Sequence, residues 1–84
     1  MKDDELISEH PHRIAIDGAT YEVLVYGSKR NDGTWSGSLR FRDVKLNKIL
    51  ATGQETSQPD RKALEYWATG VEDVYLEGAL RRAH

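Results

Sequence analysis

The chain has 84 residues, enough for one small domain with a thin hydrophobic core. Its 12 basic and 14 acidic side chains give a net charge of −2, so no overall field favours nucleic acid or an anionic membrane. The absence of cysteine excludes disulfide bonds, thiolate nucleophiles and cysteine-ligated metal sites. No stretch approaches the ~20 apolar residues that cross a bilayer, and the acidic beginning is unlike a signal peptide. We therefore expect a cytoplasmic protein that does not contact membranes.

The first segment, residues 1–12, is polar and mostly acidic. Only Leu6 and Ile7 are able to anchor it to a core, so we predict a flexible acidic arm or a single short turn. The remaining residues, 13–84, are predicted to form a single α+β domain.

Four short strands are predicted at residues 13–16, 20–26, 34–44 and 48–52. The second and third alternate apolar and polar side chains, which is typical of antiparallel strands with one buried face. Asp17-Gly18 supplies the positive φ angles that a two-residue hairpin turn requires. The apolar face carries Tyr21, Val23, Val25, Trp35, Leu39 and Phe41.

The C-terminal third has the spacing of an amphipathic helix. Ser57 and Asp60 resemble a capping box, and Pro59 suits a first helical turn. Gly70 costs about 1 kcal/mol relative to alanine inside a helix, but the apolar stripe keeps its phase across it. We favour one long helix, bent at Gly70, over two short helices. The stripe comprises Leu64, Trp67, Ala68, Val71, Val74, Tyr75 and Gly78.

These elements predict an α+β domain of two layers, in which an antiparallel sheet of three to four strands packs on one long C-terminal helix, in the order β-β-β-β-α. A helix of ~25 residues spans about 37 Å, whereas a strand of eight residues covers about 27 Å, so the last helical turns should overhang the sheet. Leu76 and Leu80 lie near that overhang, away from the stripe. We consider them either a self-association contact of a homodimer or ordinary exposed leucines.

The residues that catalysis or cofactor binding would require do not form a recognisable pattern. Ser36 and Ser38 have no histidine near them in sequence, and neither a G-x-S-x-G motif nor a phosphate-binding loop occurs. Structural metal sites take three or four protein ligands, and we expect the three histidines to be solvated. We therefore predict no enzyme, no cofactor and no metal. The histidines are His10, His12 and His84.

A basic segment is the most suggestive feature for binding. Residues 29–48 contain six basic and two acidic side chains, a local charge of +4, whereas residues 1–9 have a local charge of −3. Arginines beside Tyr26 on an open sheet face are typical of proteins that bind single-stranded nucleic acid. Cross-strand pairing with Glu22 explains the same arginines as a solvated face, and the acidic arm could also fold back onto them. This candidate surface for nucleic acid or an acidic partner comprises Lys29, Arg30, Arg40, Arg42, Lys45 and Lys48.

Three fragments, residues 21–25, 32–37 and 51–56 leading into Ala63-Leu64, resemble HicB-like antitoxins over about residues 20–80. The resemblance implies a β-β-β-α topology related to a partly degraded double-stranded-RNA-binding fold. It also implies no catalysis, a protein partner such as a small RNA-cleaving toxin, assembly into dimers or larger complexes, and repression of its own operon.

The function we predict is therefore that of a small non-catalytic interaction domain. It binds a protein partner through the open sheet face or the overhanging helix, and self-association as a homodimer is a further expectation. The alternative is an RNA- or DNA-binding, or antitoxin-like, module that uses the basic sheet face.

Overall fold

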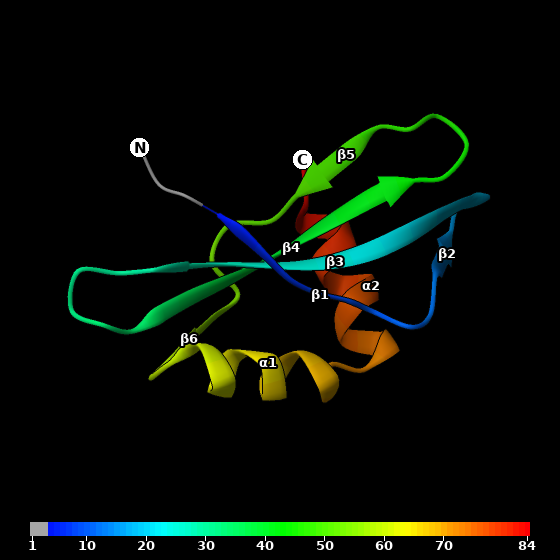
Figure 1. The fold of residues 1–84 in the computed structure, drawn as a ribbon. Helices are drawn as coiled ribbons and strands as arrows, with labels where there is room; N and C mark the ends of the chain where they lie inside the picture. The colour runs from blue at the N-terminus through cyan, green and yellow to red at the C-terminus, as the bar shows by residue number, and fades with distance from the viewer. Residues whose placement is uncertain (1–3) are drawn as a thin grey trace.

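The computed structural model describes residues 4–84 and confirms the α+β class: one antiparallel sheet lies against two C-terminal helices (Figure 1). Over these residues, neither helix is long and apolar enough to cross a membrane. The strands are β1 (Glu5–Glu9), β2 (Ile14–Ile16), β3 (Ala19–Lys29), β4 (Trp35–Asp43), β5 (Ile49–Ala51) and β6 (Thr56–Gln58), and the helices are α1 (Arg61–Thr69) and α2 (Asp73–Arg82).

The β3–β4 hairpin is the centre of the sheet, and short strands extend it on both sides. Both β1 and β2 pair with β3, while β5 and β6 both pair with β4. Each outer position is therefore shared by two short strands, which explains why residues 4–84 form six strands where three to four were predicted. The predicted turn at Asp17-Gly18 is confirmed, because these residues have φ angles of 52° and 81° between β2 and β3.

The core lies between the sheet and the helices, as the strand alternation predicts. Val23 and Val25 of β3 and Leu39 and Phe41 of β4 are buried on the face that the helices cover. Alternation with a period of two places every second side chain of a strand on this face.

Two paired glycines in the centre of the sheet make room for α1. Gly27 and Gly37 lie opposite each other in β3 and β4. A Cβ atom at Gly27 would lie 2.5 Å from Cδ2 of Leu64, and one at Gly37 would lie 2.6 Å from Cδ1 of the same leucine. The fully buried Leu64 side chain therefore fills a gap that only glycine leaves open.

The prediction of one long helix is wrong, because the chain turns at residues 70–72. Gly70 ends α1, its N–H donating to the Trp67 carbonyl at 3.1 Å, and extended Glu72 precedes α2. Figure 1 shows α2 running in a different direction from α1. Because two short helices replace one long helix, the described part of the chain has no long helix whose last turns extend beyond the sheet.

The turn also reverses which side of the second helix faces the core. Val74, predicted to face the sheet, is 74% exposed, whereas Leu76 and Leu80 are 0% and 6% exposed. Both alternatives for these two leucines, a self-association contact and ordinary exposed side chains, are therefore wrong. Their side chains belong to the hydrophobic core, and a partner cannot reach them in the folded chain.

The predicted acidic arm of residues 1–12 is also corrected where the structure describes it; residues 1–3 lie outside the described part. Glu5–Glu9 forms β1, and a register shift between Leu6 and Ser8 allows Ile7 to pack against the core. Main-chain pairing with β3 therefore orders a segment whose composition suggested a loose arm.

Two local expectations change with this packing. His10, expected to be solvated, is partly buried, and its Nε2 donates to the Val71 carbonyl at 3.3 Å, which ties the end of β1 to the turn between the helices. The predicted capping box is wrong as well, because Ser57 lies in β6. Asp60 itself caps α1, its carboxylate accepting from the Ala63 N–H at 2.8 Å.

The Asp43 carboxylate at the end of β4 holds the following turn and should make stability depend on pH. It accepts hydrogen bonds from the N–H groups of Leu46 at 3.0 Å and Lys45 at 2.9 Å, which lower its pKa below the ordinary value. A lowered folded-state pKa means that the carboxylate stabilises the fold above the unfolded-state pKa of about 4, and that this contribution disappears as the pH falls through the folded-state value.

We therefore expect Asp43→Asn to be less stable than wild type in urea unfolding at pH 7, and the difference to shrink as the pH falls below about 4. Asparagine keeps an acceptor oxygen but removes the charge, so it isolates the ionised form. A stability difference that stays constant over this range would show that the charge contributes nothing.

Candidate functional site

The six basic residues predicted as one surface are dispersed by the fold. Arg40 and Arg42 are two residues apart in β4, so both side chains lie on the open face of the sheet. Lys29 and Arg30 lie at the β3–β4 turn, and Lys45 and Lys48 lie in the β4–β5 turn at the opposite end of the hairpin (Figure 1). Arg30 is also held by Ser57 at 2.7 Å and by Gln54.

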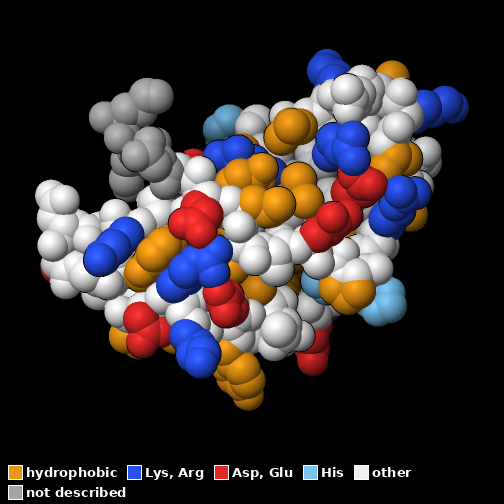
Figure 2. Space-filling model, viewed as in Figure 1, with side chains coloured by type: hydrophobic (Ala, Val, Ile, Leu, Met, Phe, Trp, Pro, Cys, Tyr) orange, Lys and Arg blue, Asp and Glu red, His pale blue; other side chains and the backbone are white. Residues whose placement is uncertain are grey.

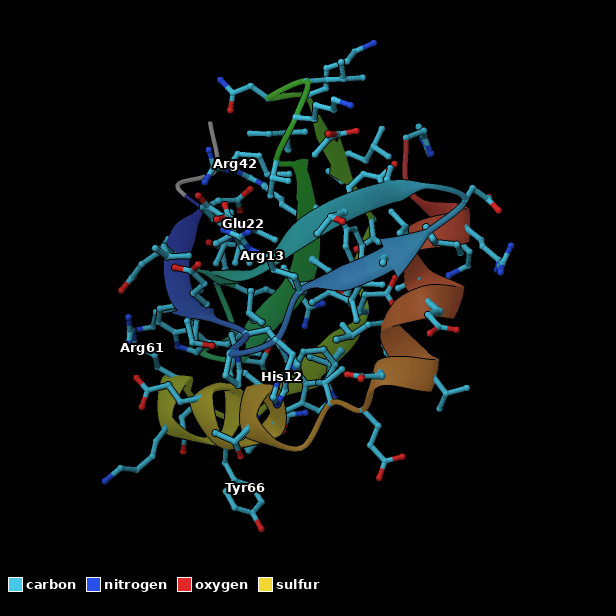
Figure 3. All side chains as sticks on the ribbon, turned by 90° about the vertical axis from the view of Figure 1, so that its right-hand side faces the viewer. His12, Arg13, Glu22, Arg42, Arg61 and Tyr66 are labelled. Atoms are coloured by element: carbon cyan, nitrogen blue, oxygen red, sulfur yellow. The ribbon has the colours of Figure 1, made fainter. Side chains whose placement is uncertain are left out.

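Arg42 forms the cross-strand ion pair that the sequence suggested as an alternative. Glu22 lies directly opposite it in β3 and accepts from both Arg42 and Arg13, the latter at 3.1 Å (Figure 3). The hydrogen bond from Arg42 is the main reason why the pKa of Glu22 lies below its ordinary value. Arg42 is therefore paired within the sheet, although it shares the single charge of Glu22 with Arg13.

Arg40 is engaged in a similar way by the N-terminal segment. Its guanidinium lies over the Tyr26 ring, 3.8 Å from the centroid, and pairs with Asp4 at 2.8 Å. Asp4 thus contacts the open face, while residues 5–9 extend the sheet as β1 and do not fold over the basic residues as the sequence alternative expected. Both the arginine and the aromatic ring that a nucleic acid would need are already in contact with each other.

The remainder of the open face is partly apolar. Figure 2 shows hydrophobic side chains gathered in the middle of this face and bordered by charged groups of both signs. Leu6 of β1 and Ile49 of β5 are large exposed side chains of this kind. The face is therefore amphipathic, and it does not present a continuous basic surface.

A second surface, which we call the helix pocket, lies between α1 and α2 next to β6. It has a volume of about 530 Å³, within the range of pockets that bind small molecules. Tyr66, at its rim, is 82% exposed and points from α1 away from the sheet (Figure 3). The pocket is lined by Gln58, Ala63, Tyr66, Trp67, Gly70, Val71, Glu72 and Tyr75.

Two aromatic rings give the helix pocket a defined wall. Trp67 and Tyr75 pack edge to face, with centroids 6.4 Å apart and planes at 88°. The Tyr75 hydroxyl donates to Glu55, which also pairs with Arg82 at 2.6 Å. Burial, and then the contact with Glu55, raise the pKa of Tyr75, so its hydroxyl stays protonated and keeps the ring in place.

The charge around the helix pocket is negative. Residues 60–82, the two helices with the residues before them, contain five acidic and four basic side chains, a local charge of −1. Glu72 lines the pocket, and the neighbouring Asp73 is exposed in the first turn of α2. The one charged side chain among the lining residues is therefore anionic, which suits cationic ligands better than phosphates or acidic peptides.

Sequence reasoning did not find the helix pocket because it assigned Trp67, Val71 and Tyr75 to the core stripe of a continuous helix. Only the turn at residues 70–72 brings these side chains around a shared space. The available signal was Gly70 as a helix end followed by Asp73 as a first-turn acid, which together mark a break and a new start.

In a comparison with known proteins, no family model matches the chain, and no curated protein or solved structure is significantly similar to it. The resemblance to HicB-like antitoxins therefore stays a prediction that rests on the fragments quoted above.

Proposed function

We propose that this chain is a non-catalytic protein-interaction domain that binds a segment of a partner protein in the helix pocket. The observation that carries the proposal is the exposure of Tyr66 beside Trp67 and Tyr75, at the rim of an apolar pocket. Tyrosine and tryptophan are enriched among the residues that dominate binding energy at protein interfaces. Exposed aromatic side chains around a concave surface are therefore better explained by a partner than by folding.

The chemistry of the lining also supports binding over catalysis. The pocket walls are mainly aromatic and aliphatic, and Glu72 is the one carboxylate among the lining residues. General acid–base catalysis usually needs a second group with an opposed pKa, placed within hydrogen-bond reach of the substrate. The nearby Tyr75 hydroxyl is already committed to Glu55.

The proposal can be tested by selecting peptides from a random displayed library against the full chain. Selected peptides should bind Tyr66→Ser at least about tenfold more weakly than wild type, the loss expected of a central aromatic contact. Leu46→Ser is the matched control, because Leu46 is also strongly exposed but lies in the β4–β5 turn. Equal affinity for Tyr66→Ser, or peptides that depend on Leu46, would contradict the proposal.

The nucleic-acid alternative has a separate test. Because Arg40 and Arg42 are paired with Asp4 and Glu22, we expect single-stranded oligonucleotides to bind more weakly than about 0.1 mM at physiological salt. Removing the two carboxylates by Asp4→Asn/Glu22→Gln should strengthen binding at low salt in a fluorescence titration. Micromolar, salt-sensitive binding by wild type that Arg40→Ala/Arg42→Ala abolishes would instead support a nucleic-acid module.

A further inference from the structure

The aromatic wall of the helix pocket has the geometry of a cation-binding corner. Trp67 and Tyr75 are almost perpendicular, so a group placed beside both rings contacts two aromatic faces at once. The faces of tryptophan and tyrosine carry partial negative charge and attract ammonium and guanidinium groups within about 6 Å. Tyr75 already attracts one such group, since Arg82 lies 5.9 Å from its ring centroid.

The pocket lining also includes one acidic residue. Glu72 lines the same pocket, at the turn where α2 begins. Arg82 does not compete for it, because its guanidinium pairs with Glu55 at 2.6 Å. The pocket therefore combines two aromatic faces with a negative charge that has no cation among the lining residues.

The size of the pocket indicates more than a free cation. A volume of about 530 Å³ exceeds the space that one lysine side chain fills, and Ala63 and Val71 provide apolar walls beside the corner. Tyr66 stands at the rim, where it can pack against a bound chain. An extended peptide with apolar residues next to a cationic one fits this combination.

Resting on the proposed function, we infer that the partner segment places a lysine side chain, free or methylated, against Trp67, Tyr75 and Glu72, with apolar neighbours on the rest of the pocket. An acidic segment would be repelled by Glu72 of the pocket lining and by the neighbouring Asp73. A wholly apolar segment would leave the exposed Glu72 carboxylate without a cationic partner. Lysine satisfies both constraints.

The test uses ¹⁵N NMR of the full chain with four acetylated and amidated peptides of sequence Gly-Leu-X-Leu-Gly. X is lysine, trimethyllysine, norleucine or glutamate, so length and apolar flanks stay constant. We expect the Trp67 indole and Gly70 amide resonances to shift, and norleucine to bind about fivefold more weakly than lysine, as expected for one cation–aromatic contact. Trimethyllysine binding tighter than lysine would assign the site to the methylated form, and the reverse to the free ammonium.

Two variants separate the carboxylate from the general charge of the domain. Glu72→Gln should reduce affinity for the lysine peptide severalfold and leave the norleucine peptide unaffected. Glu77→Gln removes the same charge from an exposed position of α2 outside the pocket lining and should change neither.

The outcomes distinguish this inference from the proposed function. If the lysine, norleucine and glutamate peptides bind the pocket equally well, the cationic side chain is not recognised, while peptide binding in the pocket stands. If the norleucine peptide binds most tightly, the inference is likewise overturned. If no peptide shifts the pocket resonances at millimolar concentration, both the inference and the proposed function are contradicted.

Discussion

Leu64→Ala is expected to lower the free energy of unfolding by about 2–5 kcal/mol, the range measured for deleting a buried leucine side chain. Leu64 is fully buried and occupies the gap above the paired glycines Gly27 and Gly37. The two glycines lie in adjacent central strands of the sheet. The hydrogen-bonded backbone there cannot easily move into the cavity that the substitution leaves. Urea unfolding followed by circular dichroism measures the loss.

A double-mutant cycle tests whether Leu64 and the glycine gap act together. Gly27→Ala alone should cost about 1–3 kcal/mol, because its Cβ would lie 2.5 Å from Cδ2 of Leu64. In the Leu64→Ala background that contact is gone and Ile7, at 3.1 Å, is the nearest remaining group, so most of the cost should disappear. Additive effects of the two substitutions would show that the gap does not hold Leu64.

Leu76→Glu is expected to destabilise the domain by more than about 4 kcal/mol, enough to leave a small domain largely unfolded. Leu76 has no exposed surface and packs in the same core as Phe41 and Leu80. A carboxylate there would lose its hydration without gaining a cation, since the buried residues that surround it are apolar. Thermal unfolding by circular dichroism, with expression level as a second measure, would show the effect.

Val74→Glu is the matched control because it introduces the same charge on the same helix, two residues away. Val74 is 74% exposed, so its substitution should change stability by no more than about 0.5 kcal/mol. The opposite order of effects, with Val74→Glu unfolding the domain and Leu76→Glu tolerated, would restore the continuous helix and refute the turn at residues 70–72.

The sheet could be predicted from sequence to a large extent because its signals are local. Alternation along β3 and β4 identifies Val23, Val25, Leu39 and Phe41 as buried, and Asp17-Gly18 marks the hairpin between β2 and β3. Each of these inferences depends on neighbouring residues in one strand or turn. None requires knowledge of what lies across the molecule.

The short outer strands could not be predicted in the same way. Residues 5–9 and 56–58 carry little strand character of their own, and they become strands because β3 and β4 offer unpaired main-chain groups. The register shift that turns Ile7 towards the core has no sequence signature. Pairing with a partner distant in the chain decides such segments, and their composition does not.

The helical region misled for a geometric reason. Leu64, Trp67 and Ala68 form a genuine apolar stripe in α1, and Val71 and Val74 happen to continue its spacing. Three residues outside helical geometry reset the phase, so a regular spacing across Gly70 carries no information about α2. The burial of Leu76 follows from this new phase.

The candidate surfaces also differ in how far the sequence could predict them. The ion pair of Arg42 with Glu22 follows from cross-strand register, so it appeared among the sequence alternatives. The contact between Arg40 and the acidic N-terminal segment follows from charge, although the segment forms a strand where an arm folded over the basic residues was expected. The helix pocket depends on how two helices meet after a turn. The sequence identified Trp67, Val71 and Tyr75 as apolar helix residues, but it could not show that they surround one pocket.

The turn at residues 70–72 is the central claim, because it both buries Leu76 and creates the helix pocket. Hydroxyl-radical footprinting of the native chain, read by mass spectrometry at single residues, tests it directly. The structure predicts rapid modification of Tyr66 and Val74 and strong protection of Leu76 and Leu80. Modification of Leu76 and Leu80 at the rate of exposed residues, with Val74 protected, would contradict it.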